Sequence, residues 1–135
     1  MQVDGACHCG RISYKAEVDP AKVGVCHCTD CQTLTGSAFS LFVPVPKEHF
    51  HLRGEPRIYV KTAESGNRRA QAFCPECGTR IYASAERDPT VFNVRIGTMR
   101  QRAALGPRAQ LWCRSALPWV NGLSSVPQHA KQPTP

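Results

Sequence analysis

The chain has 135 residues, 41% of them hydrophobic, which is enough for one domain with a buried core. No apolar run approaches the roughly 18 residues of a membrane span, and the N-terminal sequence MQVDGACHCG has no basic or apolar region typical of a secretory signal. We therefore expect a cytoplasmic protein with no membrane partner. The formal charge is +7, but the basic residues are scattered, which disfavours a nucleic-acid interface.

Short segments in which apolar and polar residues alternate follow one another along the chain. The first is RISYKAEV at 11–18, where every second residue from Ile12 to Val18 is apolar, as in a half-buried strand. Similar segments occupy 37–45, 49–52, 57–61, 70–73, 80–84, 91–97 and 109–113. Turn residues separate most of them, and no long segment has a helical period. The sequence predicts a mainly β domain of short antiparallel strands.

One short helix is expected in the middle of this pattern. Thr29 and Gln32 have the spacing of a capping box, and Gly36 can end the helix. This would place Cys31 in the first turn, where the helix dipole favours an anionic sulfur. After residue 120 the sequence is polar and rich in proline. We expect one domain over 1–120 and a poorly ordered tail over 121–135.

The eight cysteines carry the strongest functional signal. They form a C-x-C pair, a C-x-C-x-x-C triplet, a C-x-x-C pair and one lone residue, at positions Cys7 and Cys9, Cys26, Cys28 and Cys31, Cys74 and Cys77, and Cys113. In a reducing compartment, clustered cysteines usually bind metal. Zinc takes four protein ligands in structural sites and three in catalytic sites, so seven clustered cysteines divide as four plus three. The sequence thus predicts two Zn²⁺ ions per chain.

The C-P-E-C-G sequence at 74–78 resembles half of a four-cysteine site, and the pair at 7–9 is the available second half. The triplet at 26–31 then forms a site of three ligands with one coordination position open. In an alternative interpretation, Cys113 or His27 completes this second site and both zinc ions are structural. His27 lies between two ligands, however, and is expected to point away from them.

Two other residues are expected in or near the core. Cys113 follows Trp112 in an apolar segment, where a lone cysteine usually behaves as a small hydrophobic residue. Trp119 is interpreted as a core residue, with a pocket wall as the alternative. We interpret His8 and His27 as neighbours of the metal sites or as surface residues.

Six motifs together are similar to those of a known family. They are CHCG (7–10), CHCTDCQ (26–32), TGSAFS (35–40), FCPECGTRIY (73–82), NVRIGTM (93–99) and LPWV (117–120). The set resembles the glutathione-dependent formaldehyde-activating enzyme family, called Gfa, which also includes proteins like centromere protein V. The resemblance covers roughly residues 3–120.

This resemblance implies a zinc-containing β-tent (Mss4-like) fold. It implies a structural zinc at Cys7, Cys9, Cys74 and Cys77 and a catalytic zinc at Cys26, Cys28 and Cys31. It also implies the reaction of S-(hydroxymethyl)glutathione synthase, a carbon–sulfur lyase that joins glutathione and formaldehyde.

Charge considerations favour a thiol substrate. Zinc held by three thiolates has a local charge of −1 and activates water less well than zinc held by neutral histidines. A thiol bound as fourth ligand loses its proton and keeps a nucleophilic sulfur. The predicted function is a zinc-dependent carbon–sulfur lyase acting on a small thiol such as glutathione. Gln32, Ser37 and Phe39 follow the triplet closely and are candidate substrate-binding residues, and His27 is the nearest candidate general acid.

Two other classes of function stay open. A non-catalytic zinc scaffold that binds protein or nucleic acid would have both metals fully ligated by the protein. A thiol redox enzyme using Cys113 would require this cysteine to be exposed and reactive.

Overall fold

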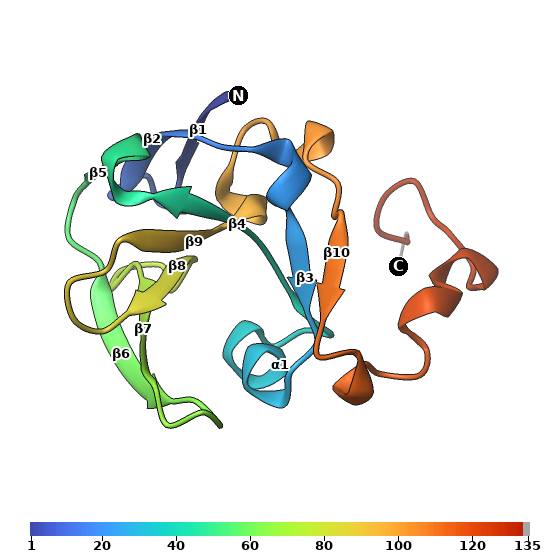
Figure 1. Ribbon diagram of the computed structural model, residues 1–135. Helices are drawn as coiled ribbons and strands as arrows, with labels where there is room; N and C mark the ends of the chain where they lie inside the picture. The colour runs from blue at the N-terminus through green and yellow to red at the C-terminus, as the bar shows by residue number, and fades with distance from the viewer. Residues whose placement is uncertain (134–135) are drawn as a thin grey trace.

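The computed structural model of the chain describes residues 1–133, which fold into two β-sheets and one short α-helix (Figure 1). The smaller sheet has the order β1-β2-β5, with β1 (Gln2–Ala6), β2 (Ser13–Glu17) and β5 (Phe50–Arg53). The larger sheet has the order β10-β3-β4-β9-β8-β7-β6. Its strands are β3 (Gly24–Cys26), β4 (Ser40–Pro46), β6 (Arg57–Thr62), β7 (Arg68–Phe73), β8 (Arg80–Ala85), β9 (Val91–Arg95) and β10 (Ala109–Leu111).

The helix α1 (Thr29–Thr35) lies between the two ends of the larger sheet in the view of Figure 1, with β6 on one side and β10 on the other. The described part of the chain also contains six 3₁₀ helices, at Pro20–Lys22, Lys47–His49, Ile96–Thr98, Arg102–Ala104, Cys113–Ser115 and Val120–Ser125. Within residues 1–133, the structure contains no helix with the length and apolar character needed to span a membrane.

The prediction of a mainly β fold is confirmed, because each predicted alternating segment contains a strand. Two strands, β1 and β3, were not predicted. The paired strands run antiparallel except for β3 and β10, which are parallel, so the expectation of an entirely antiparallel body was wrong at this one pair. The parallel pairing is possible because the 82 residues between the two strands provide a long crossover.

The hydrophobic core joins the two sheets. Its central side chains include Val3, Ile12 and Tyr14 from the smaller sheet and its turn, and Val43, Ile81 and Val94 from the larger sheet. An aromatic cluster connects them, since Phe50 of β5 packs on Tyr82 and Phe92 at ring-centroid distances of 5.7 and 5.1 Å. Burial of each large apolar side chain contributes about 1.5–3 kcal/mol. Cys7 and Cys74 lie in this core, so part of one cysteine group is built into the packed centre of the domain.

The predicted helix is present, but its cap differs from the prediction. The N-cap residue is Cys28, not Thr29, and the Cys28 sulfur accepts a hydrogen bond from the Cys31 amide at 3.3 Å. The Gln32 side chain therefore forms no capping box and donates elsewhere. Gly36 ends the helix as predicted, with φ = 62° in the left-handed region that favours glycine.

The C-terminal segment begins with the 3₁₀ helix Val120–Ser125, and residues 121–133 are exposed. Residues 134–135, the end of the predicted tail, lie outside the described residues. The division into a domain and a poorly ordered tail stays a prediction.

Candidate metal centres

The first cysteine group combines two short turns that are distant in sequence. Cys7 and Cys9 follow β1, Cys74 and Cys77 follow β7, and the four sulfurs lie within 4.8 Å of one another. Cys9 and Cys74 are 65 positions apart. Because β1 belongs to the smaller sheet and β7 to the larger one, a metal bound here would fasten the two sheets together.

The two turns share one backbone design. The Gly10 amide donates to the Cys7 carbonyl at 3.1 Å, and the Gly78 amide donates to the Cys74 carbonyl at 2.9 Å. Both glycines have positive φ, 82° and 76°, a conformation that a residue with a side chain rarely adopts. The sequence therefore places one glycine after each cysteine pair for a conformational reason.

The sulfur positions fit a tetrahedral ion. Cys9 Sγ lies 3.6 Å from Cys7 Sγ and 3.7 Å from Cys74 Sγ. Zinc–sulfur bonds of about 2.3 Å at tetrahedral angles put neighbouring sulfurs about 3.8 Å apart. The donor set and its spacing thus match zinc.

Neutral hydrogen-bond donors surround this group. The Ile12 amide donates to Cys7 Sγ at 3.3 Å, and the Thr79 hydroxyl lies 3.2 Å from Cys77 Sγ. Hydrogen bonding by Thr79 lowers the pKa of Cys77 to about 5. Burial alone would raise the pKa of Cys7, but the Ile12 amide and the thiols of Cys9 and Cys74 lower it overall. These donors favour the thiolate forms that bind metal.

The second cysteine group comes from a single turn of chain. Cys26 ends β3, Cys28 caps α1 and Cys31 lies in its first turn. Their three sulfurs lie within 4.8 Å of one another, and no further His, Cys, Asp or Glu of residues 1–133 joins them. In particular, neither His27 nor Cys113 belongs to the group. Three thiols at this spacing can hold a metal ion and leave room for a fourth ligand.

One thiol of this group, that of Cys31, has a lowered pKa. Hydrogen bonding with Cys26 is the main cause that lowers the pKa of Cys31 to about 5, and the Ser40 hydroxyl, Cys28 and the positive charge of Arg95 contribute. The pKa of Cys26 is correspondingly raised, mainly by Cys31 and by burial. These contacts favour the thiolate form of Cys31, which is the form that binds metal.

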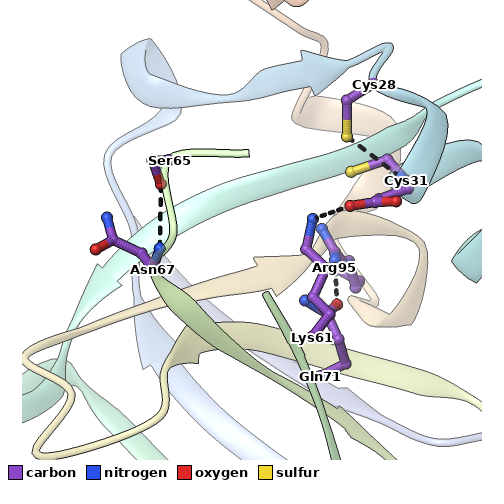
Figure 2. Close-up of polar contacts among 8 residues, drawn as sticks. Cys28, Cys31, Lys61, Ser65, Asn67, Gln71 and Arg95 are labelled. Atoms are coloured by element: carbon purple, nitrogen blue, oxygen red, sulfur yellow. Dashed lines mark hydrogen bonds and ion pairs between the residues drawn. The ribbon is translucent and has the colours of Figure 1, made fainter. Parts of the chain in front are cut away.

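Two cationic side chains from other strands lie beside this group, and neither was singled out in the sequence. Figure 2 shows Arg95 of β9 and Lys61 of β6 on the side of Cys31. Lys61 Nζ forms an ion pair with Asp30 at 2.8 Å, whereas Arg95 donates to the Gln71 amide oxygen at 3.5 Å. The alternating pattern of 91–97 assigned Arg95 to the polar face of a strand, but it carried no signal that this face meets the cysteines.

A pocket of about 370 Å³ opens next to the second group. Its lining includes Cys28, Asp30, Lys61, Glu64, Trp112 and Arg114. Arg114 pairs with Glu64 at 3.0 Å and stacks on the Trp112 ring at 4.8 Å. The pocket thus combines one cysteine of the second group with charged and aromatic walls. A larger hollow of about 520 Å³ lies over the smaller sheet beside Tyr14 and has no cysteine in its lining.

The comparison with known families agrees with this arrangement. The profile of the family described as "Glutathione-dependent formaldehyde-activating enzyme" matches residues 2–115, which include all seven grouped cysteines. The chain belongs to this family. The β-tent architecture inferred from the resemblance is that of the family, and the mainly β structure agrees with it.

Two individual proteins are similar to the chain. An uncharacterized lyase of Schizosaccharomyces pombe is 28% identical over 81 residues, which are 60% of this chain and 56% of that protein. The chain thus matches little more than half the length of this relative. A Rhodobacter sphaeroides protein of known crystal structure has a TM-score of 0.60 at 18% identity, with 79% of this chain and 98% of that chain covered. This second likeness concerns the fold.

The predicted substrate-binding residues do not converge on the pocket beside Cys28. Gln32 Nε2 donates to the carbonyls of His27 and Ser115, at 2.8 and 3.0 Å, and so fastens α1 to the chain segment at 113–115. Ser37 is exposed just after the helix, and Phe39 packs edge-on against His27 at 5.6 Å. Their contact with a substrate stays a prediction.

His27 is buried and its ring contacts Gln110 instead of the thiols. Its Nε2 atom lies 2.8 Å from Gln110 Oε1, and its buried Nδ1 atom has no hydrogen-bond partner. With Phe39 it lines a separate hollow of about 500 Å³. A role for His27 as general acid gains no support from this position.

The predictions for Cys113 and Trp119 as core residues were wrong. Cys113 begins a 3₁₀ helix and is exposed, because Trp112 adopts a left-handed conformation with φ = 56° that ends the apolar segment after β10. Trp119 is 56% exposed. Exposure of Cys113 is one of the properties that a thiol redox function would require.

Proposed function

We propose that the protein is a zinc-dependent carbon–sulfur lyase whose substrate is a small thiol. The structural zinc would be held by Cys7, Cys9, Cys74 and Cys77, and the reactive zinc by Cys26, Cys28 and Cys31. The observation that carries the proposal is the difference between the groups: one offers four sulfurs, and the other offers three next to a pocket. Membership in the family and the lyase-named relative support the reaction class.

The chemistry follows from the donor set. Bound zinc would stabilise the substrate thiolate while the three cysteine sulfurs keep the centre electron-rich and the substrate sulfur nucleophilic. Cys26, Cys28 and Cys31 would hold the zinc, and Cys28 lines the pocket from which the thiol would approach. The sulfur adds to an aldehyde carbon, a carbon–sulfur bond forms, the thiol proton leaves to solvent and the new alkoxide takes a proton from water. The reverse sequence is the lyase direction.

Within this class, the family description supports glutathione as the thiol and formaldehyde as the aldehyde, with S-(hydroxymethyl)glutathione as product. Glutathione carries two carboxylates, and the pocket offers the positive charges of Lys61 and Arg114. Lys61 and Arg114 are already paired with Asp30 and Glu64. They would therefore help to orient the carboxylates of glutathione through the local electrostatic potential. The reaction needs reduced thiols, which is consistent with a cytoplasmic setting.

The proposal is tested by the rate of hemithioacetal formation. Glutathione and formaldehyde are mixed with the zinc-loaded protein, and exchange between free and adduct signals is followed by NMR. Cys28→Ser should abolish the acceleration, because one ligand of the reactive site is lost. Cys113→Ser is the matched control and should retain it.

The same pair of variants distinguishes the lyase proposal from a thiol redox function, the alternative that the exposed Cys113 favours. In that case Cys113→Ser, and not Cys28→Ser, would remove activity, measured as oxidation of the thiol. No acceleration by the wild-type protein would contradict the lyase proposal.

A further inference from the structure

Arg95 is an arginine without a carboxylate partner in a largely enclosed position. Its Nε atom is buried and has no hydrogen-bond partner among residues 1–133, where one terminal nitrogen reaches only the neutral Gln71 side chain, at 3.5 Å. None of the ion pairs in the described part of the chain includes it. A buried cation that lacks an anionic partner is costly, so its position calls for a compensating charge.

The anions that can compensate Arg95 are the cysteine thiolates. Burial lowers the pKa of Arg95, and the charges of Cys31, Cys26 and Cys28, in this order of strength, act in the opposite direction. Figure 2 shows the Arg95 side chain between Gln71 and the turn that carries Cys31. The nearby Arg80 adds repulsion, which increases the need for negative charge at this place. The guanidinium therefore lies in the field of all three sulfurs.

The two cysteine groups differ in this respect. In the four-cysteine group, the Ile12 amide and the Thr79 hydroxyl contact the sulfurs, and both of these groups are neutral. Four thiolates around a zinc ion carry a net charge of −2, but they need no further ligand. Three thiolates carry −1, and the charge becomes −2 only when an anionic fourth ligand binds. A fixed positive charge beside this group therefore stabilises an anionic fourth ligand when that ligand binds.

We propose that Arg95 is the counter-ion of the three-cysteine metal site and makes this site prefer an anionic fourth ligand over a neutral one. The inference rests on the proposed function, because it assumes that the site binds metal and takes a fourth ligand. A positive charge stabilises a −2 centre about twice as strongly as a −1 centre at the same distance. A thiolate therefore gains from Arg95, whereas imidazole or water leaves the centre at −1 and gains nothing further. Arg95 would be a positioning and selectivity residue that does not ligate the metal.

The first measurement compares zinc affinity at the three-cysteine site by competition with a chelator. Arg95→Gln removes the charge, Arg95→Lys keeps it, and Arg53→Gln makes the same change in charge on β5 of the other sheet. Loss of a residue that supports metal ligands typically weakens metal binding roughly 10- to 100-fold. We expect such a loss for Arg95→Gln, a smaller one for Arg95→Lys and none for Arg53→Gln. Equal affinities for wild type and Arg95→Gln would overturn the proposal.

The second measurement addresses selectivity. The cobalt-substituted proteins are titrated with glutathione and with imidazole, and the ratio of the two affinities is compared. Arg95→Gln should lower the preference for glutathione by about tenfold or more, whereas Arg53→Gln should leave the ratio unchanged. An unchanged ratio in Arg95→Gln would overturn the selectivity claim.

The two failures are distinguishable. If the wild-type cobalt protein binds no thiol, the proposed function fails and the counter-ion role is decided by the zinc affinities alone. If wild type binds thiol and Arg95→Gln binds it as tightly, the inference fails and the proposed function stands. If Arg95→Gln does not fold, Arg95→Met removes the same charge while it keeps the length of the side chain, and the same outcomes apply.

Discussion

The two cysteine groups differ in how far apart their cysteines lie in the sequence and in where they sit in the fold. The four-cysteine group takes its cysteines from segments 65 positions apart and lies where the two sheets meet. The three-cysteine group takes all its cysteines from 26–31, at the junction of one short strand and one short helix. Closure of a long loop makes a metal site a cross-link of the fold, whereas a local site can gain or lose its metal with little effect on distant contacts.

Their surroundings differ as well. Two sulfurs of the first group, Cys7 and Cys74, belong to the hydrophobic core. The second group faces a polar interior with Ser40 and Arg95 and a pocket with charged walls. A closed, core-bound site suits stability, and an open, charged site suits exchange of a ligand.

The largest expected effect separates the two groups by mutation. Cys74→Ser removes a ligand of the cross-link, and a structural zinc contributes on the order of 10 kcal/mol in small zinc peptides. We expect insoluble protein or a melting temperature lower by at least about 10 °C. Cys28→Ser should remove one equivalent of zinc and leave the melting temperature within a few degrees of wild type. Elemental analysis and thermal unfolding of both variants check this, and equal losses of melting temperature would contradict the distinction.

A smaller effect is expected at Gln32, which separates a structural role from substrate binding. Its side chain satisfies the carbonyls of His27 and Ser115, so Gln32→Ala leaves two acceptors without this donor. The cost should be about 1–3 kcal/mol, with unchanged zinc content. The neighbouring exposed Thr33→Ala serves as control in urea unfolding. A Gln32→Ala variant of wild-type stability with weaker thiol binding would instead support the prediction that Gln32 contacts the substrate.

The effect that is smallest at neutral pH, because it arises only in alkaline solution, concerns the smaller sheet, which carries one half of the four-cysteine group. Burial raises the pKa of Tyr14 to about 12, against 10 for an ordinary tyrosine, and its hydroxyl lies 2.6 Å from that of Thr98. The unfolded chain ionises first, so stability is complete below pH 10 and decreases as the pH rises from 10 to 12. The loss should amount to about 2–3 kcal/mol once both states are ionised. Tyr14→Phe should make stability decrease less steeply with pH in alkaline unfolding experiments, while the contribution of Tyr82, whose pKa burial also raises, remains; an unchanged slope would contradict the prediction.

Much of the fold follows from local patterns in the sequence. The segments with period two were correctly predicted as strands because one face of each packs on the core. The pattern failed for β1, where Gly5 occupies an inward position: a side chain there would overlap Tyr14 and the Thr98 carbonyl. It also failed for β3, whose three residues are all buried and therefore show no alternation. Both strands depend on tertiary contacts that a local pattern does not contain.

The candidate sites show the same limit. Cysteine spacing was sufficient to predict the two groups, because ligands from short turns must converge on one ion. It was not sufficient to predict Arg95 or Lys61, which lie beside the second group but belong to β9 and β6, strands distant from it in sequence. Cys113 was misplaced because the left-handed conformation of Trp112 turns the chain out of the strand at a residue type that gives no such signal.

Binding of a thiol through its sulfur at the three-cysteine site is the central claim, and the metal itself can report it. Cobalt in place of zinc reports its fourth ligand through the sulfur-to-metal charge-transfer absorption. We predict that titration of the cobalt protein with glutathione strengthens this absorption, whereas an analogue with serine in place of cysteine leaves it unchanged. The Cys28→Ser variant should show no response to either. If the loaded wild-type protein has the same spectrum with and without glutathione, the three-cysteine site does not bind the thiol, and the central claim is contradicted.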